Sequence, residues 1–270
     1  MSSYMVNSAV TVPGLAAMKS RGEKIVALTA YDATFAQLLD GAGVDVTLVG
    51  DSLGMVVQGH ATTLSTTIDE MVYHTRCVAR GNKRALLVAD LPFMTYPTPE
   101  RAAENAARLI REGHAQMVKL EGGRSKADIV RFLVGQGIPV CGHLGLLPQS
   151  INQLGTYLVQ GKDDRSGQTL LEDALLLQEA GAGLLVIECV PATLGEEVSS
   201  AVDIPVIGIG AGAGCDGQVL VLHDMLGLGV GKRPRFVKDF MEEAGDIPSA
   251  LLAYAQAVRN GSFPAQEHCF

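Results

Sequence analysis

One junction occurs three times in this chain and constrains its fold more than any other feature. At residues 38–51 (LLDGAGVDVTLVGD), 109–121 (LIREGHAQMVKLE) and 177–188 (LQEAGAGLLVIE), the end of an amphipathic helix meets a glycine and then an apolar run that finishes on an acid. Glycine ends helices well because it adopts the left-handed conformation at little cost. Such Val-, Leu- and Ile-rich runs are typical of parallel strands buried on both faces. The junction therefore predicts repeated helix–strand units in a parallel α/β fold.

The same pattern continues along the chain and predicts strands that alternate with helices. Strands are expected at residues 24–29, 45–50, 84–89, 116–120, 138–142, 184–187, 204–209 and 218–223. Helices are expected at residues 32–40, 68–80, 99–112, 126–134, 169–180, 192–201 and 236–259. The connection GAGAGCDG before the last strand is too short for a helix. Eight strands within about 250 residues favour closure into a (β/α)8 TIM barrel, and an open doubly wound sheet is the alternative.

Signals for helix starts support these ranges. Thr67 with Glu70, and Ser125 with Asp128, have the three-residue spacing of a capping box. Thr98 comes directly before a proline, and proline is favoured at the first position of a helix. Because no linker or low-complexity stretch divides the chain, we expect a single barrel domain over residues 1–270, with residues 1–22 as an N-terminal extension.

Composition excludes several classes of protein. The 21 Lys and Arg against 29 Asp and Glu give a formal net charge of −8, and no basic run is present, so we expect no nucleic-acid or anionic-membrane partner. The start lacks a signal-peptide pattern, and no apolar stretch approaches the ~18 residues that span a bilayer. The five cysteines include no CxxC pair, which fits neither a disulfide framework nor a zinc site. A reducing cytoplasm is the expected compartment.

Ionisable residues gather at the predicted carboxyl ends of the strands, where barrel enzymes place their reacting groups. Asp51, Asp90 and Glu121 follow three consecutive strands and would lie close together, so their mutual repulsion calls for a cation. An all-oxygen ligand set suits a hard ion, Mg²⁺ first, with Mn²⁺ or another divalent ion as a substitute. Taken singly, each acid has the alternative of a turn residue or a helix cap.

Two further residues at this rim suggest chemistry. Lys119 lies two residues before Glu121 on one strand, so both side chains share a face, and a buried lysine there suits an anionic substrate group. A structural ion pair is the alternative for Lys119. Glu188 follows an apolar run, where burial would raise its pKa toward the range of a general base. An acid on a solvated loop is the alternative for Glu188.

Other rim residues are less specific. His143 can be a ligand, a hydrogen-bond donor or, as is commonest, a satisfied rim histidine. Cys141 fits a small core residue better than a nucleophile, since nothing nearby in the sequence lowers its thiol pKa. The run GIGAGAG at residues 208–214 is not followed by a helix pattern, so a dinucleotide fingerprint is excluded. Two interpretations of this run remain: a tight turn, or a place where the backbone closely approaches a ligand.

A set of long motifs, in order over nearly the whole chain from about residue 22, resembles the ketopantoate (3-methyl-2-oxobutanoate) hydroxymethyltransferase family. The motifs are TAYD at 29–32, LVGDSLGM at 48–55, ADLPFM at 89–94, MVKLEGG at 117–123, VCGHLGLLPQS at 140–150, ECVP at 188–191, IGIGAG at 207–212, CDGQVLVLHD at 215–224 and FPAQEH at 263–268. The resemblance implies a (β/α)8 barrel of the phosphoenolpyruvate mutase and isocitrate lyase superfamily. It also implies a cytoplasmic homodecamer.

The resemblance further implies an activity. A hydroxymethyl group would pass from 5,10-methylenetetrahydrofolate to 3-methyl-2-oxobutanoate through a Mg²⁺-stabilised enolate, giving ketopantoate and tetrahydrofolate for pantothenate and coenzyme A synthesis. By the matching motifs, Glu188 is the catalytic proton acceptor. The implied substrate site and Mg²⁺ ligand set overlap: the former is Asp51, Ser52, Asp90 and Lys119, and the latter is Asp51, Asp90 and Glu121.

Two other functions are weighed against this one. A lyase or mutase of the same superfamily would act on a 2-oxo acid, but those relatives carry a catalytic cysteine on a mobile loop in a KKCGH-like context, whereas Cys141 stands in PVCGH. A non-catalytic barrel that binds a keto acid or folate would bind without turnover. The joint presence of a base, a lysine and a set of metal-ligating acids argues against the binding barrel.

Overall fold

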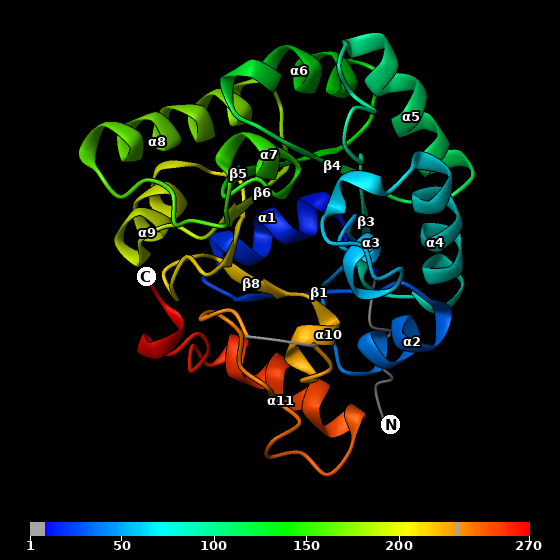
Figure 1. The fold of residues 1–270 in the computed structure, drawn as a ribbon, viewed down its shortest axis with the longest axis vertical. Helices are drawn as coiled ribbons and strands as arrows, with labels where there is room; N and C mark the ends of the chain where they lie inside the picture. Colours follow the sequence, from blue (N-terminus) through cyan, green and yellow to red (C-terminus); the bar gives the residue numbers. More distant parts are fainter. Residues whose placement is uncertain (1–8, 230–232) are drawn as a thin grey trace, which may run out of the picture.

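The computed structural model describes residues 9–229 and 233–270, and its centre is a closed barrel of parallel strands (Figure 1). The strands are hydrogen-bonded around the barrel in chain order, with the last beside the first. They are β1 Ile25–Thr29, β2 Val46–Val49, β3 Leu86–Asp90, β4 Met117–Glu121, β5 Val140–Gly145, β6 Leu184–Glu188, β7 Val206–Ile209 and β8 Gly217–Leu220. The (β/α)8 prediction is confirmed, and the open sheet is excluded because β1 pairs with β8.

Helices surround this barrel (Figure 1). They are α1 Val12–Ser20, α2 Ala33–Gly41, α3 Leu53–Val56, α4 Ile68–Gly81, α5 Pro99–Arg111, α6 Ala127–Gly135, α7 Ile151–Leu154, α8 Asp164–Glu179, α9 Ala192–Ala201, α10 Leu222–Met225 and α11 Ile247–Arg259. Two predicted starts are confirmed: Thr67 and Glu70 form both hydrogen bonds of a capping box, and Thr98 accepts from the backbone N–H of Arg101. Strand residues are buried almost throughout, since side chains fill the barrel inside and helices cover it outside.

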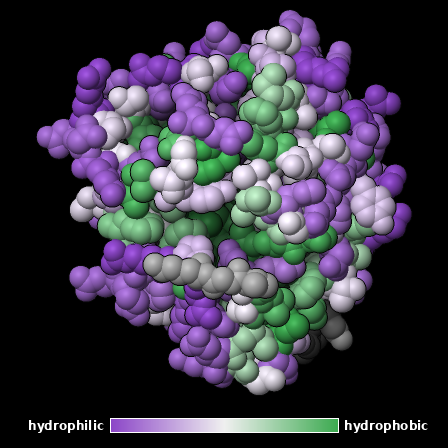
Figure 2. Space-filling model, in the orientation of Figure 1, coloured by the Kyte–Doolittle hydropathy of each residue, from purple (hydrophilic) through white to green (hydrophobic). Residues whose placement is uncertain are grey.

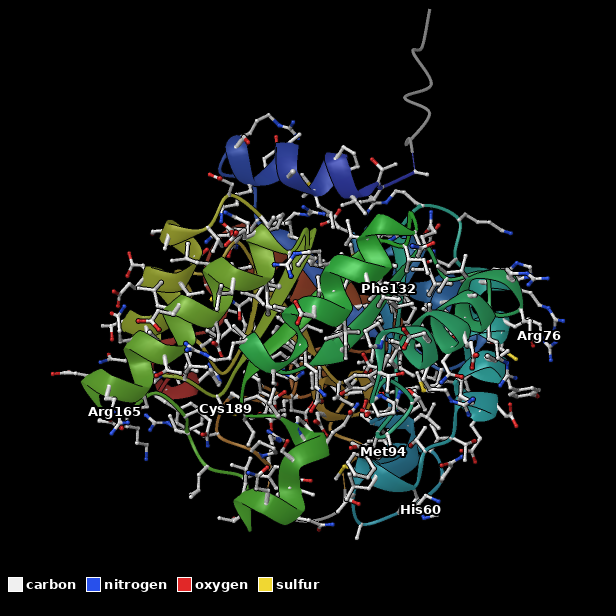
Figure 3. All side chains as sticks on the ribbon, turned by 90° about the horizontal axis from the view of Figure 1, so that it is seen from above. His60, Arg76, Met94, Phe132, Arg165 and Cys189 are labelled. Carbon is white, nitrogen blue, oxygen red and sulfur yellow. The ribbon has the colours of Figure 1, made fainter. Side chains whose placement is uncertain are left out.

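Helix α1 closes the end of the barrel at which the strands begin. Its Leu15 is fully buried, and the Lys19 ammonium lies 2.9 Å from Asp216 and donates to the carbonyl of Ile204, just before β7. Figure 3 shows α1 at one end of the molecule, and the labelled Met94 and His60 near the other. Within the predicted extension, residues 1–8 lie outside the described residues, whereas α1 is packed on the barrel.

Two predicted helix starts and one predicted cap are wrong. Helix α11 begins at Ile247, not at residue 236, because Asp246 caps it by accepting from the N–H of Ser249 and a proline stands in its first turn. Helix α8 begins five residues before the predicted 169, since Asp163 provides its cap. Ser125 forms no capping box; it lies in a 3₁₀ turn that leads into α6.

The last predicted strand is too long. It ends at Leu220 rather than at residue 223, because the N–H of Leu222 donates to the Thr29 hydroxyl at 2.9 Å and α10 begins there. This places residues 222–225 in a helical turn over the carboxyl end of the barrel. Short helices such as α3 and α7 were not predicted either, since a single turn leaves no periodic pattern in a sequence.

The three junctions use their glycines differently. Gly43 and Gly181 have φ angles of 78° and 98°, the left-handed conformation expected after a helix. At the second junction His114 takes this conformation instead, with φ 64°. Gly113 is required there for space, because a Cβ on it would lie 2.6 Å from the carbonyl oxygen of Leu109.

Candidate active site

A cavity of about 820 Å³ opens at the carboxyl ends of the strands. Figure 2 looks onto this face and shows a hollow with hydrophobic residues inside and hydrophilic residues around it. Every predicted site residue lines the cavity: Asp51, Ser52, Asp90, Lys119, Glu121 and Glu188, together with His143. As predicted from their positions at strand ends, the barrel brings together residues that are spread over more than 130 positions of sequence.

Lys119 and Asp90 form the best-defined ion pair of the cavity floor. They are register partners on β4 and β3, and the Lys119 ammonium lies 2.7 Å from Oδ1 of Asp90, with both side chains buried. Burial lowers the pKa of Lys119, but the charges of Asp90, Glu121 and Asp51 outweigh it and raise the pKa above its usual range. Lys119 therefore carries a charge at neutral pH, beside the space where a substrate would bind.

Gln149, in the turn before α7, joins two of the acids and was not among the predicted site residues. Its side-chain amide donates to Oδ2 of Asp51 at 2.8 Å, and its backbone N–H donates to Oε2 of Glu121 at 3.0 Å. The Tyr96 hydroxyl donates to the side-chain oxygen of Gln149 and accepts from the N–H of Glu121. The only sequence signal was its place in the motif LLPQS, because a glutamine in a loop has no periodicity that marks it.

Asp51 and Asp90 are linked through the backbone. The N–H of Asp51 donates to Oδ2 of Asp90 at 3.0 Å, and the Thr66 hydroxyl donates to the carbonyl of Asp51. Burial, followed by the nearby charges of Asp90 and Glu121, raises the pKa of Asp51 well above its usual range. Asp51 is thus a carboxyl group that lacks sufficient positive charge around it.

His143 lies between two acids, deep in the barrel. It is the register partner of Glu121, and its ring nitrogens lie 3.4 Å from Oε1 of Glu121 and 3.2 Å from Oε2 of Glu188. These contacts have ion-pair distances, although their angles are poor for hydrogen bonds. Burial and Lys119 lower the pKa of His143, but the two acids outweigh them and raise it to about 9. His143 is therefore a buried, positively charged group between the two acids.

Glu188 ends β6 and reaches the cavity, where it is less buried than the other acids. The next residue, Cys189, has a left-handed φ of 48°, which is uncommon outside glycine. Its N–H donates to the carbonyl of Ile209, and its carbonyl accepts from the N–H of Gln160. These bonds hold the backbone turn that directs Glu188 at His143.

Ser52 stands at the cavity wall, beside Asp51. Its hydroxyl lies 2.9 Å from the hydroxyl of Tyr31, and it makes no capping bond to α3. Gly50 leaves room for this arrangement, since a Cβ there would lie 2.8 Å from the Ser52 hydroxyl. Ser52 is therefore available to a ligand next to the acids.

The donor set fits a divalent cation by charge. With Glu188 and the charged His143 included, four acids against two cations leave a net charge of −2 in the cavity floor when all the acids are ionised. Within residues 9–229 and 233–270, no three His, Cys, Asp or Glu side chains lie close enough to share one ion. Mg²⁺ suits such a site, because it binds through one or two carboxylates and completes its shell with substrate oxygens and water.

By its fold and its site, the protein belongs to the class of (β/α)8 barrel enzymes, with acidic residues at the carboxyl ends of its strands. The barrel is similar to that of a putative phosphonomutase from Burkholderia cenocepacia J2315, with a TM-score of 0.60 and 17% identity, over 79% of this chain and 95% of that one. It is also similar to 2,3-dimethylmalate lyase, a PEP mutase/isocitrate lyase superfamily member, with a TM-score of 0.52 and 15% identity, over 73% of this chain and 70% of that one. These similarities agree with the predicted (β/α)8 barrel fold.

The chain belongs to the ketopantoate hydroxymethyltransferase family, whose model matches residues 9–266. It is 59% identical over 261 residues to the 3-methyl-2-oxobutanoate hydroxymethyltransferase of Methylococcus capsulatus, covering 97% of both chains. It is also 59% identical to the same enzyme of Burkholderia multivorans, covering 97% of this chain and 96% of that one. The predicted family, and with it the prediction of an enzyme, is confirmed. None of the described helices is long and apolar enough to cross a membrane.

Proposed function

We propose that the protein transfers a hydroxymethyl group from 5,10-methylenetetrahydrofolate to 3-methyl-2-oxobutanoate, giving ketopantoate and tetrahydrofolate for pantothenate and coenzyme A synthesis. Family membership supports the reaction. The observation that carries the mechanism is the arrangement of the cavity floor, where buried, undercompensated acids face Glu188 across His143. An acid that abstracts a proton and a cluster that attracts a divalent cation then lie in one cavity.

The acidic cluster would hold the keto acid together with Mg²⁺. Of Asp51, Asp90 and Glu121, one or two would bind the ion directly and the others through water, since no three such side chains of the described residues lie close enough to share it. Bound Mg²⁺ would act as a Lewis acid that polarises the keto carbonyl. The charged Lys119 and the Ser52 hydroxyl would bind oxygens of the substrate. Phosphonopyruvate hydrolase, which has this type of fold, has been solved in complex with Mg²⁺ and oxalate, and oxalate is a two-carbon diacid.

Glu188 would be the general base that removes the C3 proton of the keto acid. A positioned base of this kind accelerates a reaction roughly 10²- to 10⁴-fold. His143, within 3.2 Å of Glu188, would orient its carboxylate and offset its negative charge. One C–N bond of the methylene bridge would open to an iminium, with the proton taken from C3 going to the freed nitrogen, and the enolate carbon would attack the iminium carbon. Water would then replace the second nitrogen on that carbon: its oxygen becomes the hydroxyl group, its proton goes to the nitrogen, and tetrahydrofolate leaves.

The other two functions weighed from the sequence have less support. The Cys141 thiol is buried inside the barrel, and burial raises its pKa to about 12, so it is unsuited to the loop chemistry of a lyase. A binding barrel without turnover would not need Glu188 and His143 directed into the same cavity. From the family resemblance we also propose that the protein is cytoplasmic and forms a homodecamer. Light scattering of the purified protein tests the homodecamer.

The direct test is incubation of the purified protein with 3-methyl-2-oxobutanoate, methylenetetrahydrofolate and Mg²⁺. Ketopantoate should form, and removal of Mg²⁺ with EDTA should stop its formation. No ketopantoate under these conditions, or a rate unaffected by EDTA, would contradict the proposal. Assays with phosphonopyruvate and 2-methylisocitrate serve as controls for the lyase and mutase reactions and should give no product.

A further inference from the structure

The acidic and the basic residues that line the cavity lie at different depths. Its floor carries the buried acids, whereas the described residues of its mouth include the cations Lys162, Arg233 and Arg235, all at exposed positions. The chain as a whole has a formal net charge of −8, so this group of cations departs from the general charge of the protein. Exposed cations at the mouth of a cleft attract anionic ligands and hold their charged ends.

Two of these cations have no acid to neutralise them. Arg233 forms ion pairs with Asp239 at 2.8 Å and with Glu242 at 3.1 Å. Arg235 donates only to the backbone carbonyl of Glu267 and lies 5.6 Å from the ring centre of Phe270. Among the residues that the structure describes, no carboxylate lies within ion-pair distance of Lys162 or Arg235, so both cations are available to an anion.

The cavity is much larger than the keto acid alone requires. At the ~30 Å³ that a water molecule occupies in the liquid, the eight non-hydrogen atoms of 3-methyl-2-oxobutanoate need about 240 Å³. The cavity measures about 820 Å³, so well over half of it remains for a second ligand. A second ligand that filled this space would reach from the acidic floor to the cations of the mouth.

The wall of the outer part suits a ring system. Tyr157 and Leu158 are 47% and 54% exposed although they are large apolar side chains, and Phe236 and Phe270 also line the cavity. Exposed apolar groups beside a cleft commonly mark ligand contacts, and aromatic rings stack on flat ligands. The outer cavity thus combines an apolar wall with free cations, which fits an aromatic ligand with a polycarboxylate tail.

We propose that Lys162 and Arg235 bind the carboxylates of the glutamate tail of the folate co-substrate, while the apolar wall at Tyr157 and Leu158 contacts its rings. This inference rests on the proposed function, because that function supplies the folate. It also gives the ligand a direction, with the reactive methylene carbon toward Glu188 and the tail toward solvent. Each further γ-linked glutamate adds a carboxylate near the two cations, so longer tails bind more tightly.

The test compares folates that differ only in tail length. The folate KM is measured with the mono- and triglutamate forms of methylenetetrahydrofolate for wild type, the double variant Lys162→Ala/Arg235→Ala, and the control Lys83→Ala, an exposed lysine at the other end of the barrel. Wild type and control should show a lower KM for the triglutamate. The double variant should raise that KM about fivefold, equivalent to about 1 kcal/mol from two exposed ion pairs. Its keto-acid KM should stay at the wild-type value.

A second measurement separates this inference from the proposed function. Calorimetric binding of tetrahydrofolate triglutamate, which needs no turnover, should weaken by the same factor in the double variant, and the weakening should shrink at high salt. Turnover with wild type but with no effect of tail length would overturn the inference and leave the proposed function standing. Binding that the double variant leaves unchanged, or wild type that binds no folate at all, would also overturn it.

Discussion

Removing the Lys119 charge should destabilise the protein strongly, because Lys119 is the lysine that offsets three buried acids. The variant Lys119→Met keeps the length and the apolar stem of the side chain but deletes the ammonium that lies 2.7 Å from Asp90. Asp90 and Lys119 are only 3% and 5% exposed, so little water reaches them to replace the lost partner. Glu121 would keep His143 as a positive neighbour at 3.4 Å, but Asp51 and Asp90 would then face each other without a compensating charge.

The magnitude follows from the geometry. Unit charges about 4 Å apart interact by about 4 kcal/mol at an effective dielectric constant of 20. Removal of one partner from a buried ion pair costs about 3–5 kcal/mol in measured cases, because the other charge remains buried and unpaired. We therefore expect Lys119→Met to lower the free energy of unfolding by about 3–5 kcal/mol in EDTA. The double variant with Asp90→Asn should recover about half of that loss, since it also removes one of the acids.

Urea unfolding in EDTA, followed by far-UV circular dichroism at one fixed protein concentration, measures both values; the chain has no tryptophan for a fluorescence signal. The Asp90→Asn single variant completes the double-mutant cycle. Added Mg²⁺ should stabilise Lys119→Met more than wild type, because its cluster carries one more uncompensated negative charge. A loss below about 1 kcal/mol for Lys119→Met, or strict additivity of the two changes, would refute the reasoning.

Three other outcomes are expected. Gln149→Leu should lower the free energy of unfolding by about 1–3 kcal/mol in the same urea assay, because Asp51 loses its buried amide donor; a loss under about 0.5 kcal/mol would show that the bond is unimportant. Asp90→Asn should raise the Mg²⁺ concentration for half-maximal ketopantoate formation, and an unchanged requirement would remove Asp90 from the ligand set. Three of the five cysteines are buried, which raises their thiol pKa far above the usual range and keeps the reactive thiolate scarce at pH 8. Ellman's reagent should therefore react quickly only with the partly exposed Cys77 and Cys269 until urea is added, and five fast thiols in native protein would contradict this. The three buried thiols are Cys141, Cys189 and Cys215.

The barrel was predictable because its signals are local and repeated. A buried parallel strand is an apolar run whatever its partner, and a helix that packs on it repeats its apolar residues every three or four positions. The start at Thr67 was predictable because its cap stands directly before the apolar pattern of the helix. The caps Asp163 and Asp246 were missed because the apolar pattern begins after the first and before the second. Single turns such as α3, α7 and α10 depend on contacts made only in the folded barrel.

The site was predictable only where it lies on strands. Asp90, Lys119, Glu121 and Glu188 occupy strand ends, and the barrel rule places strand ends together. Gln149 comes from a loop, and only the fold brings its amide to Asp51, over a separation of 98 residues. The role of His143 was left open by the sequence, because its place between Glu121 and Glu188 depends on the register of β4, β5 and β6.

Proton exchange at C3 of 3-methyl-2-oxobutanoate in deuterated solvent, followed by proton NMR with Mg²⁺ and without folate, tests the central claim most directly. Wild type should exchange this proton, and Glu188→Gln should still bind the keto acid but exchange it at least about 100-fold more slowly. An exchange rate in Glu188→Gln equal to that of wild type would contradict the account, because another group would then be the base.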